Sequence, residues 1–147
     1  MQAAPPVRLM KEADEIRRSY AGVLDLEIRE GDASMWFVHF KGAEGTIYAG
    51  EPFTLRFKFS REYPIESPEV VFVGTPPTHE HVYPNGFICL SILYADWSPV
   101  LKVSTVCMSI LSMLSSATHK SAPAGGEALR MYSSPKQVSW AFHDDKC

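Results

Sequence analysis

The sequence opens with the period of an amphipathic helix. Pro5-Pro6 suit the start of a helix and Gly22 suits its end. Charged residues occupy the positions between the apolar ones, as expected for a helix that buries one face. The apolar residues, which lie three or four positions apart, are Leu9, Ala13, Ile16 and Tyr20.

Four strand patterns follow this helix. In the clearest of them, residues 53–59, apolar and polar side chains alternate, which predicts a strand with one face in the core and one in water. Short turn signals such as Gly31-Asp32 separate the strands, so we expect an antiparallel meander. The four predicted strands are Leu24–Ile28, Trp36–Phe40, Phe53–Phe59 and Val70–Val73.

A long segment without a regular period, Gly74–Ser98, comes after the last strand. Prolines and glycines interrupt it, and a loop of this length in a compact domain is usually functional. A helical pattern returns at Val103–Leu114, and a shorter one covers Glu127–Tyr132. Strands that run together, with helices at both ends, predict an α+β fold in which the second helix covers the apolar face of the sheet.

Composition agrees with a single globular domain over residues 1–147, with a tail, residues 133–147, that we expect to be ordered only in part. Of the 147 residues, 46% are hydrophobic and 21% charged, which argues against disorder. A net charge of −3 and a pI near 5.9 argue against a nucleic-acid-binding protein.

Compartment and membrane partners are also constrained by the sequence. No apolar run approaches the roughly 20 residues that span a bilayer, and the N-terminus has no secretory signal pattern. The three cysteines, Cys89, Cys107 and Cys147, have no CxxC spacing and fit a reducing compartment. We therefore expect a cytoplasmic or nuclear protein without a membrane partner.

Candidate chemistry lies in the long loop. Cys89 is either a small buried hydrophobe or an exposed nucleophile, and its local sequence leaves both possibilities open. Its apolar neighbours disfavour a protease-like thiolate but permit a thiol that carries an acyl group as a thioester. That role needs a thiol that solvent can reach in a shallow groove. His79 and His81 precede it, and because no fourth ligand is evident we expect no metal site. His79 is expected to hydrogen-bond within the loop, and His81 to lie near Cys89 and stabilise a reacting carbonyl or accept a proton.

At these residues the chain resembles the ubiquitin-conjugating enzymes. The resemblance is carried by residues 85–90, by Trp97-Ser98-Pro99 at the matching spacing and by Tyr63-Pro64, and it extends from about residue 8 to residue 132. The His-Pro-Asn signature of the family is replaced by residues 79–81, His-Glu-His. The final His resembles the W-type branch, which conjugates ubiquitin to protein α-amino groups, whereas Glu80 departs even from that branch.

The resemblance implies the ubiquitin-conjugating fold: an N-terminal helix, a four-stranded antiparallel meander, a long active-site loop and then helices. It further implies that Cys89 accepts ubiquitin as a thioester from the activating enzyme and transfers it to protein amines. Ser91 and residues 124–126 stand where many lysine-modifying members carry acidic groups, which favours α-amino substrates. No cofactor is expected, since the activating enzyme uses the ATP.

Partner-binding positions follow from the same resemblance. Arg8 and Lys11 lie on the helix face that, by this resemblance, meets the activating enzyme. Trp140 either packs on the domain or belongs to a mobile tail that helps to receive substrates with flexible N-termini. Trp97 is expected to support the loop that follows it, and Asn85 to fit a turn. The residues that correspond to the loops that bind RING or U-box ligases are Ile65, Ser98, Pro99 and Val100.

Other functions are compatible with parts of the sequence. The chain could conjugate a different ubiquitin-like modifier, or it could be a non-catalytic ubiquitin-binding variant or a structural module. The presence of Cys89 argues against the non-catalytic variant, because such variants lack the cysteine.

Overall fold

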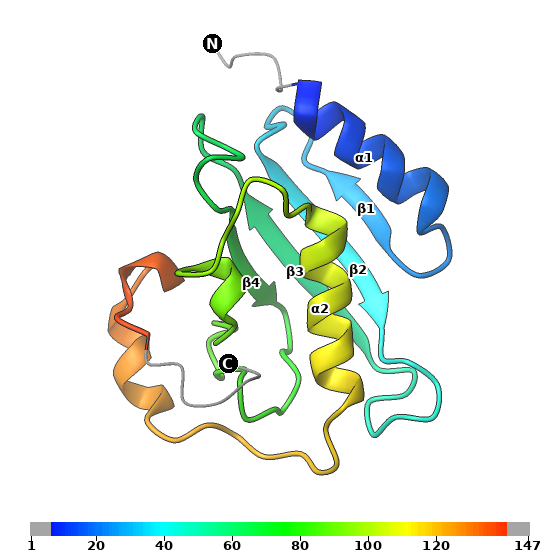
Figure 1. Cartoon of the computed structure of the whole chain (residues 1–147). Helices are drawn as coiled ribbons and strands as arrows, with labels where there is room; N and C mark the ends of the chain where they lie inside the picture. Colours follow the sequence, from blue (N-terminus) through cyan, green and yellow to red (C-terminus); the bar gives the residue numbers. More distant parts are fainter. Residues whose placement is uncertain (1–6, 141–147) are drawn as a thin grey trace.

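The computed structural model describes residues 7–140 of the chain. Within this range the elements follow the predicted order, and the α+β fold is confirmed (Figure 1). The segment predicted as a short helix near residues 127–132 is a 3-10 helix instead. The elements are α1 (Val7–Ser19), β1 (Asp25–Ile28), β2 (Met35–Lys41), β3 (Pro52–Lys58), β4 (Glu69–Val73), α2 (Val103–Ser115) and the 3-10 helices η1 (Ser91–Leu93), η2 (Gly126–Met131) and η3 (Pro135–Gln137).

The strands form one antiparallel sheet in the order β1-β2-β3-β4, as the meander prediction requires. The register places Val38 opposite Leu26 on one side and Leu55 on the other, so apolar side chains from three strands meet on one face. Figure 1 shows α2 lying across the sheet, while α1 runs beside β1. This arrangement follows from the alternation in the sequence, which gives each strand one face to bury.

The core lies between the sheet and the helices. Trp36, Phe57 and Leu55 from the strands are almost fully buried, and so are Ile16 from α1 and Ile110 from α2. The helical stripe predicted from the three- and four-residue spacing is therefore the buried face of each helix. The other members of α2 that the core buries are Val103, Val106, Cys107, Met113 and Leu114.

The start of α2 is held by a residue from α1. Lys102 precedes the helix and makes no side-chain hydrogen bond that caps it. Instead the carboxylate of Glu12 accepts a hydrogen bond from the Val103 N–H at 2.7 Å. A negative group at this end of a helix satisfies a backbone donor and interacts favourably with the helix dipole. The two helices are thus joined by a polar contact as well as by apolar packing.

Candidate active site

A tight turn anchors the loop that leads to Cys89. The Gly86 N–H donates to the Tyr83 carbonyl at 2.8 Å, and the Asn85 side chain accepts from the Phe87 N–H at 3.1 Å. The Gly86 carbonyl accepts from the Phe72 N–H of β4 at 2.9 Å, which fastens the turn to the edge of the sheet. The prediction that Asn85 fits a turn is confirmed.

Cys89 lies at the end of this anchored segment. Its N–H donates to the carbonyl of His81 at 2.9 Å, so the two stretches of loop run against each other. Its exposed fraction is only 4%, and the expectation of a solvent-exposed thiol is therefore wrong for this conformation. The described residues that form the core cluster include Ile88 but not Cys89, so the cysteine is covered outside the main core.

His81 is placed beside Cys89, as the sequence predicts. It is 7% exposed, and its backbone N–H donates to Nδ1 of His79 at 2.9 Å. Because His79 accepts at Nδ1, a neutral His79 carries its proton on Nε2. This bond confirms that His79 hydrogen-bonds within the loop. Nε2 of His81 lies 3.7 Å from a carboxylate oxygen of Glu80, the residue that replaces the usual proline of the family signature.

An aromatic residue that sequence reasoning missed supports the residue directly before the cysteine. The hydroxyl of Tyr94 donates to the carbonyl of Ile88 at 2.9 Å, directly before Cys89. Burial raises the pKa of the Tyr94 phenol, so it remains a donor at physiological pH. The ring of Trp140 stacks on Tyr94 with centroids 5.1 Å apart and lies 5.8 Å from Tyr83, which confirms that Trp140 packs on the domain. Tyr94 follows no recognisable motif, so only the structure could identify it.

Two exposed apolar side chains occupy the loops predicted to bind ligases. Ile65 is 73% exposed and Val100 is 80% exposed. Trp97 joins the loops, because its indole N–H donates to the carbonyl of Pro64 at 2.9 Å. This bond connects Trp97 to the earlier loop, and its support of the loop that follows it stays a prediction. Pro99 is exposed as well, and Ser98 is half-buried.

Arg8 and Lys11 differ in their surroundings. Lys11 is exposed on α1. Arg8 is 32% exposed, and its Nη2 donates to the carbonyls of Pro99 and Leu101, both at 2.8 Å. On the expected basic face Lys11 is therefore accessible to a partner, whereas the guanidinium of Arg8 is hydrogen-bonded within the chain.

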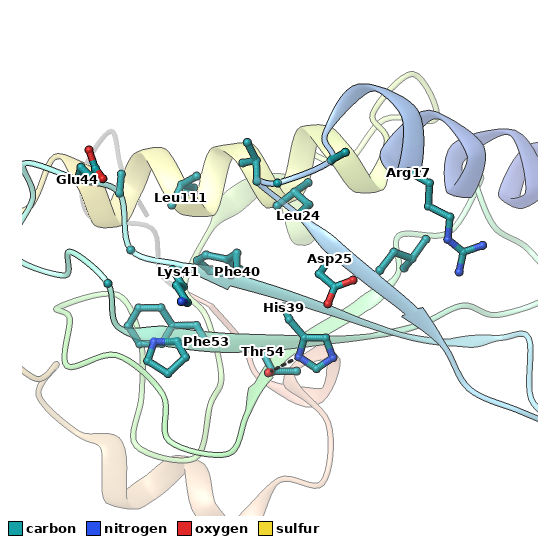
Figure 2. A pocket seen from close by; sticks show the side chains of 18 residues that line it. Arg17, Leu24, Asp25, His39, Phe40, Lys41, Glu44, Phe53, Thr54 and Leu111 are labelled. Atoms are coloured by element: carbon teal, nitrogen blue, oxygen red, sulfur yellow. Dashed lines mark hydrogen bonds between the residues drawn. The ribbon is translucent and has the colours of Figure 1, made fainter.

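A large cavity lies on another part of the molecule (Figure 2). It measures about 1010 Å³, and neither Cys89 nor His81 lines it. Phe40 and Phe53 form part of its apolar wall, and at its rim His39 is hydrogen-bonded to Thr54 at 2.8 Å. Volume alone therefore does not identify the chemical site in this protein.

Neither a metal site nor a membrane-spanning helix is present within residues 7–140. In that part of the chain no group of three or more His, Cys, Asp or Glu side chains is arranged to hold a metal ion. No helix among the same residues is long and apolar enough to cross a membrane.

Comparison with known proteins gives a consistent result. The family model for ubiquitin-conjugating enzymes matches residues 8–141. A probable ubiquitin-conjugating enzyme E2 W of Dictyostelium discoideum is 51% identical over 142 residues, which cover 94% of each chain. Ubiquitin-conjugating enzyme E2 W of Caenorhabditis elegans is 48% identical over 150 residues and 99% of each chain. Among solved structures, the ubiquitin-conjugating enzyme UbcA1 of Agrocybe aegerita superimposes with a TM-score of 0.82 at 39% identity, covering 92% of this chain and all of its own.

Proposed function

Because this chain belongs to the ubiquitin-conjugating enzyme family, within its E2 W group, we propose that Cys89 is the residue that carries ubiquitin. Enzymes of this family act with ubiquitin, an activating enzyme and ligases. In the loading step the Cys89 thiolate attacks the C-terminal glycine carbonyl of ubiquitin, and the thiolate of the activating enzyme leaves. In the transfer step a substrate amine attacks the new thioester, a C–N bond forms, and Cys89 leaves as a thiolate.

The observation that carries this proposal is the hydrogen bond from the Cys89 N–H to the His81 carbonyl. The bond holds His81, which replaces the Asn of the family signature, beside Cys89, the proposed nucleophile. Cys107 is a poor alternative, because it lies in the core on α2 and burial raises the pKa of its thiol. Since Cys89 is only 4% exposed, loading requires its sulfur to become accessible to the incoming thioester.

We also propose that the enzyme prefers α-amino groups to lysines. An α-amino group has a pKa of about 7.7–8.0, against about 10.4 for lysine, a gap worth roughly 3.5 kcal/mol of deprotonation. An N-terminus therefore needs little help to become a free nucleophile. The site provides little help with deprotonating an amine. Ser91 stands two residues after the cysteine, where many lysine-modifying members carry an acid, and Glu127 is exposed and lies 3.7 Å from Arg130. His81 would stabilise the oxyanion or accept the amine proton.

The partner surfaces form part of the same proposal. Ile65, Ser98, Pro99 and Val100 would contact a RING or U-box ligase, and Lys11 the activating enzyme. The exposure of Ile65 and Val100 supports the first assignment, because large apolar side chains at the centre of an interface often dominate its affinity. The enzyme would work in the cytoplasm or nucleus without a cofactor of its own.

Thioester formation tests the role of Cys89. The chain is incubated with activating enzyme, ATP and ubiquitin and is run on a non-reducing gel. We expect a shifted band that reductant removes, that persists in Cys107→Ala and that Cys89→Ser converts to a reductant-resistant ester. A shift with another ubiquitin-like modifier but none with ubiquitin would instead assign the chain to that modifier. A reductant-sensitive ubiquitin band retained in Cys89→Ala would remove Cys89 from the mechanism.

Substrate preference and His81 are tested together in a discharge assay. The ubiquitin-loaded enzyme is mixed with a lysine-containing peptide whose N-terminus is free or acetylated. We expect discharge to the free peptide alone, slowed about 100-fold by His81→Ala, as for loss of an oxyanion donor. The exposed residue His119 provides the matched control, His119→Ala. Equal discharge to both peptides would contradict the α-amino preference, and an unchanged rate in His81→Ala would contradict the role of His81.

A further inference from the structure

A chain of polar contacts connects helix α1 with both loops that carry the exposed apolar residues. One loop contains Ile65 and the other Val100, and Trp97 joins them through the carbonyl of Pro64. The contacts from α1 begin at Arg8 and Glu12, one helical turn apart, whose side chains are bonded at 2.8 Å. This arrangement gives the helix a direct mechanical connection to a candidate docking surface.

The side chain of Arg8 holds the second loop by hydrogen bonds to backbone carbonyls of that loop. Nη2 donates to the carbonyls of Pro99 and Leu101, the residues on either side of Val100. Two bonds from one nitrogen to carbonyls two residues apart fix the path of the chain between them. The rigid fork of a guanidinium suits this task, whereas a lysine ammonium cannot reproduce its geometry. The direction of the exposed Val100 side chain therefore depends on Arg8.

Glu12 uses both carboxylate oxygens in the same assembly. Oε1 accepts from the Val103 N–H at 2.7 Å, and Oε2 accepts from the Tyr63 hydroxyl at 2.6 Å as well as from Arg8. Glu12 and Tyr63 are each 4% exposed. Tyr63 lies two residues before Ile65, so this carboxylate connects the first loop, the start of α2 and Arg8. A buried charge that is bonded by several donors holds its partners in defined positions.

We propose that Arg8 and Glu12 form a clamp that sets the relative position of Ile65 and Val100 and thereby tunes the affinity of this surface for a ligase. The proposal rests on the proposed function, since it takes these loops as the ligase-binding surface. Arg8 and Glu12 are then positioning residues. Their effect reaches the ligase through the two loops, even where neither side chain touches it.

Buried variants provide the cleanest test, because they cannot act by direct contact with a partner. Glu12→Gln keeps the shape but replaces one acceptor oxygen with an NH₂ donor, which must face a donor from Val103, Tyr63 or Arg8. Tyr63→Phe removes only the hydroxyl, and it replaces Glu12→Gln as the test variant if Glu12→Gln does not fold. Matched controls on exposed positions of α1 are Asp14→Asn and Arg18→Lys.

Two measurements are made on each variant. In the first, an isolated RING domain that stimulates discharge by the wild-type enzyme is titrated into the ubiquitin-loaded variant. The titration gives two separate quantities: the half-saturating RING concentration, and the maximal stimulation relative to the unstimulated rate. We expect Glu12→Gln, Tyr63→Phe and Arg8→Lys to raise the half-saturating concentration by up to about tenfold, the equivalent of about 1.4 kcal/mol, with maximal stimulation retained. The controls should match wild type.

The second measurement is the NMR methyl spectrum of Ile65 and Val100 in the chain alone. The clamp variants should shift these resonances, whereas Asp14→Asn and Arg18→Lys should leave them in place. Unchanged methyl resonances together with an unchanged half-saturating concentration in a folded Glu12→Gln or Tyr63→Phe would overturn the proposal. The methyl spectra need no ubiquitin, so a chain that forms no thioester would refute the proposed function while the spectra still decide on the clamp.

Discussion

The turn before Cys89 depends on a glycine, and Gly86→Ala gives the sharpest stability test of the site. Gly86 has a φ of +92°, a conformation that costs an L-residue roughly 1–2 kcal/mol. A Cβ built there would lie 2.1 Å from the carbonyl oxygen of Phe72. The substitution therefore adds a clash with sheet backbone to the conformational strain.

The size of the effect follows from these two contributions. Backbone cannot yield as a flexible side chain does, so the turn must move away from β4. That movement breaks the 2.9 Å hydrogen bond from the Phe72 N–H to the Gly86 carbonyl, worth about 0.5–1.5 kcal/mol, and leaves polar groups poorly paired. Together with the strain, we expect a loss of about 3–4 kcal/mol, a large part of the roughly 5–15 kcal/mol that stabilises a typical domain.

Urea unfolding followed by circular dichroism measures this loss, and Gly22→Ala is the matched control. Gly22 has a φ of +83°, but a Cβ there would meet nothing within 4 Å. The control therefore reports strain alone, and the difference between the two variants reports the close approach. Thioester loading of Gly86→Ala should fall as well, because the turn precedes Cys89 by only three residues.

A loss for Gly86→Ala no larger than that for Gly22→Ala would refute this reasoning. It would mean that the turn relaxes freely and that its attachment to β4 contributes nothing to the position of Cys89. Loading at the wild-type rate in a destabilised Gly86→Ala would separately refute the link between the turn and the cysteine.

Three further predictions concern other groups. Tyr94→Phe should lower the free energy of unfolding in urea by about 1–3 kcal/mol, because the Ile88 carbonyl loses its donor; an unchanged value would contradict that bond. The hydrogen bond from Lys102 lowers the pKa of Glu15 below its ordinary 4.5, so its stabilisation is complete above that pH and is lost as pH falls through the lower folded value. Urea unfolding between about pH 5 and pH 3 should thus be less steeply pH-dependent in Glu15→Gln than in wild type, and equal slopes would be inconsistent with the shift. Iodoacetamide at neutral pH should label Cys107 only after unfolding, since burial raises its thiol pKa; mass spectrometry showing labelling of the native chain would disprove this.

Patterns of short range predicted the fold well. The alternation in residues 53–59 produced β3, and the three- and four-residue spacing in residues 103–114 produced the buried face of α2. Such periodicities succeed because each reports which side of one element is buried, and that depends on its own residues. The proximity of His81 to Cys89 was expected from their positions in the same long loop, and not from periodicity or composition.

Contacts between distant segments were not predictable in this way. Glu12 reads as one of several charged residues on a helix, yet its partners Tyr63 and Val103 lie 51 and 91 residues away. Tyr94 lies only six residues from Ile88, but the segment between them has no regular period that would predict the bond from the Tyr94 hydroxyl to the Ile88 carbonyl. Each of these contacts depends on which segments pack together after folding, and a single sequence does not directly indicate that packing.

The hydrogen bond between Cys89 and His81 has a consequence for transition-state stabilisation. In many acyl-transfer enzymes the amide of the nucleophilic residue itself donates to the negatively charged oxygen of the tetrahedral intermediate. Here the Cys89 N–H already donates to the His81 carbonyl, so in this conformation it is not available to that oxygen. In this conformation the Cys89 amide therefore does not stabilise that charge, and the proposed catalyst depends correspondingly more on sulfur as an easily expelled leaving group.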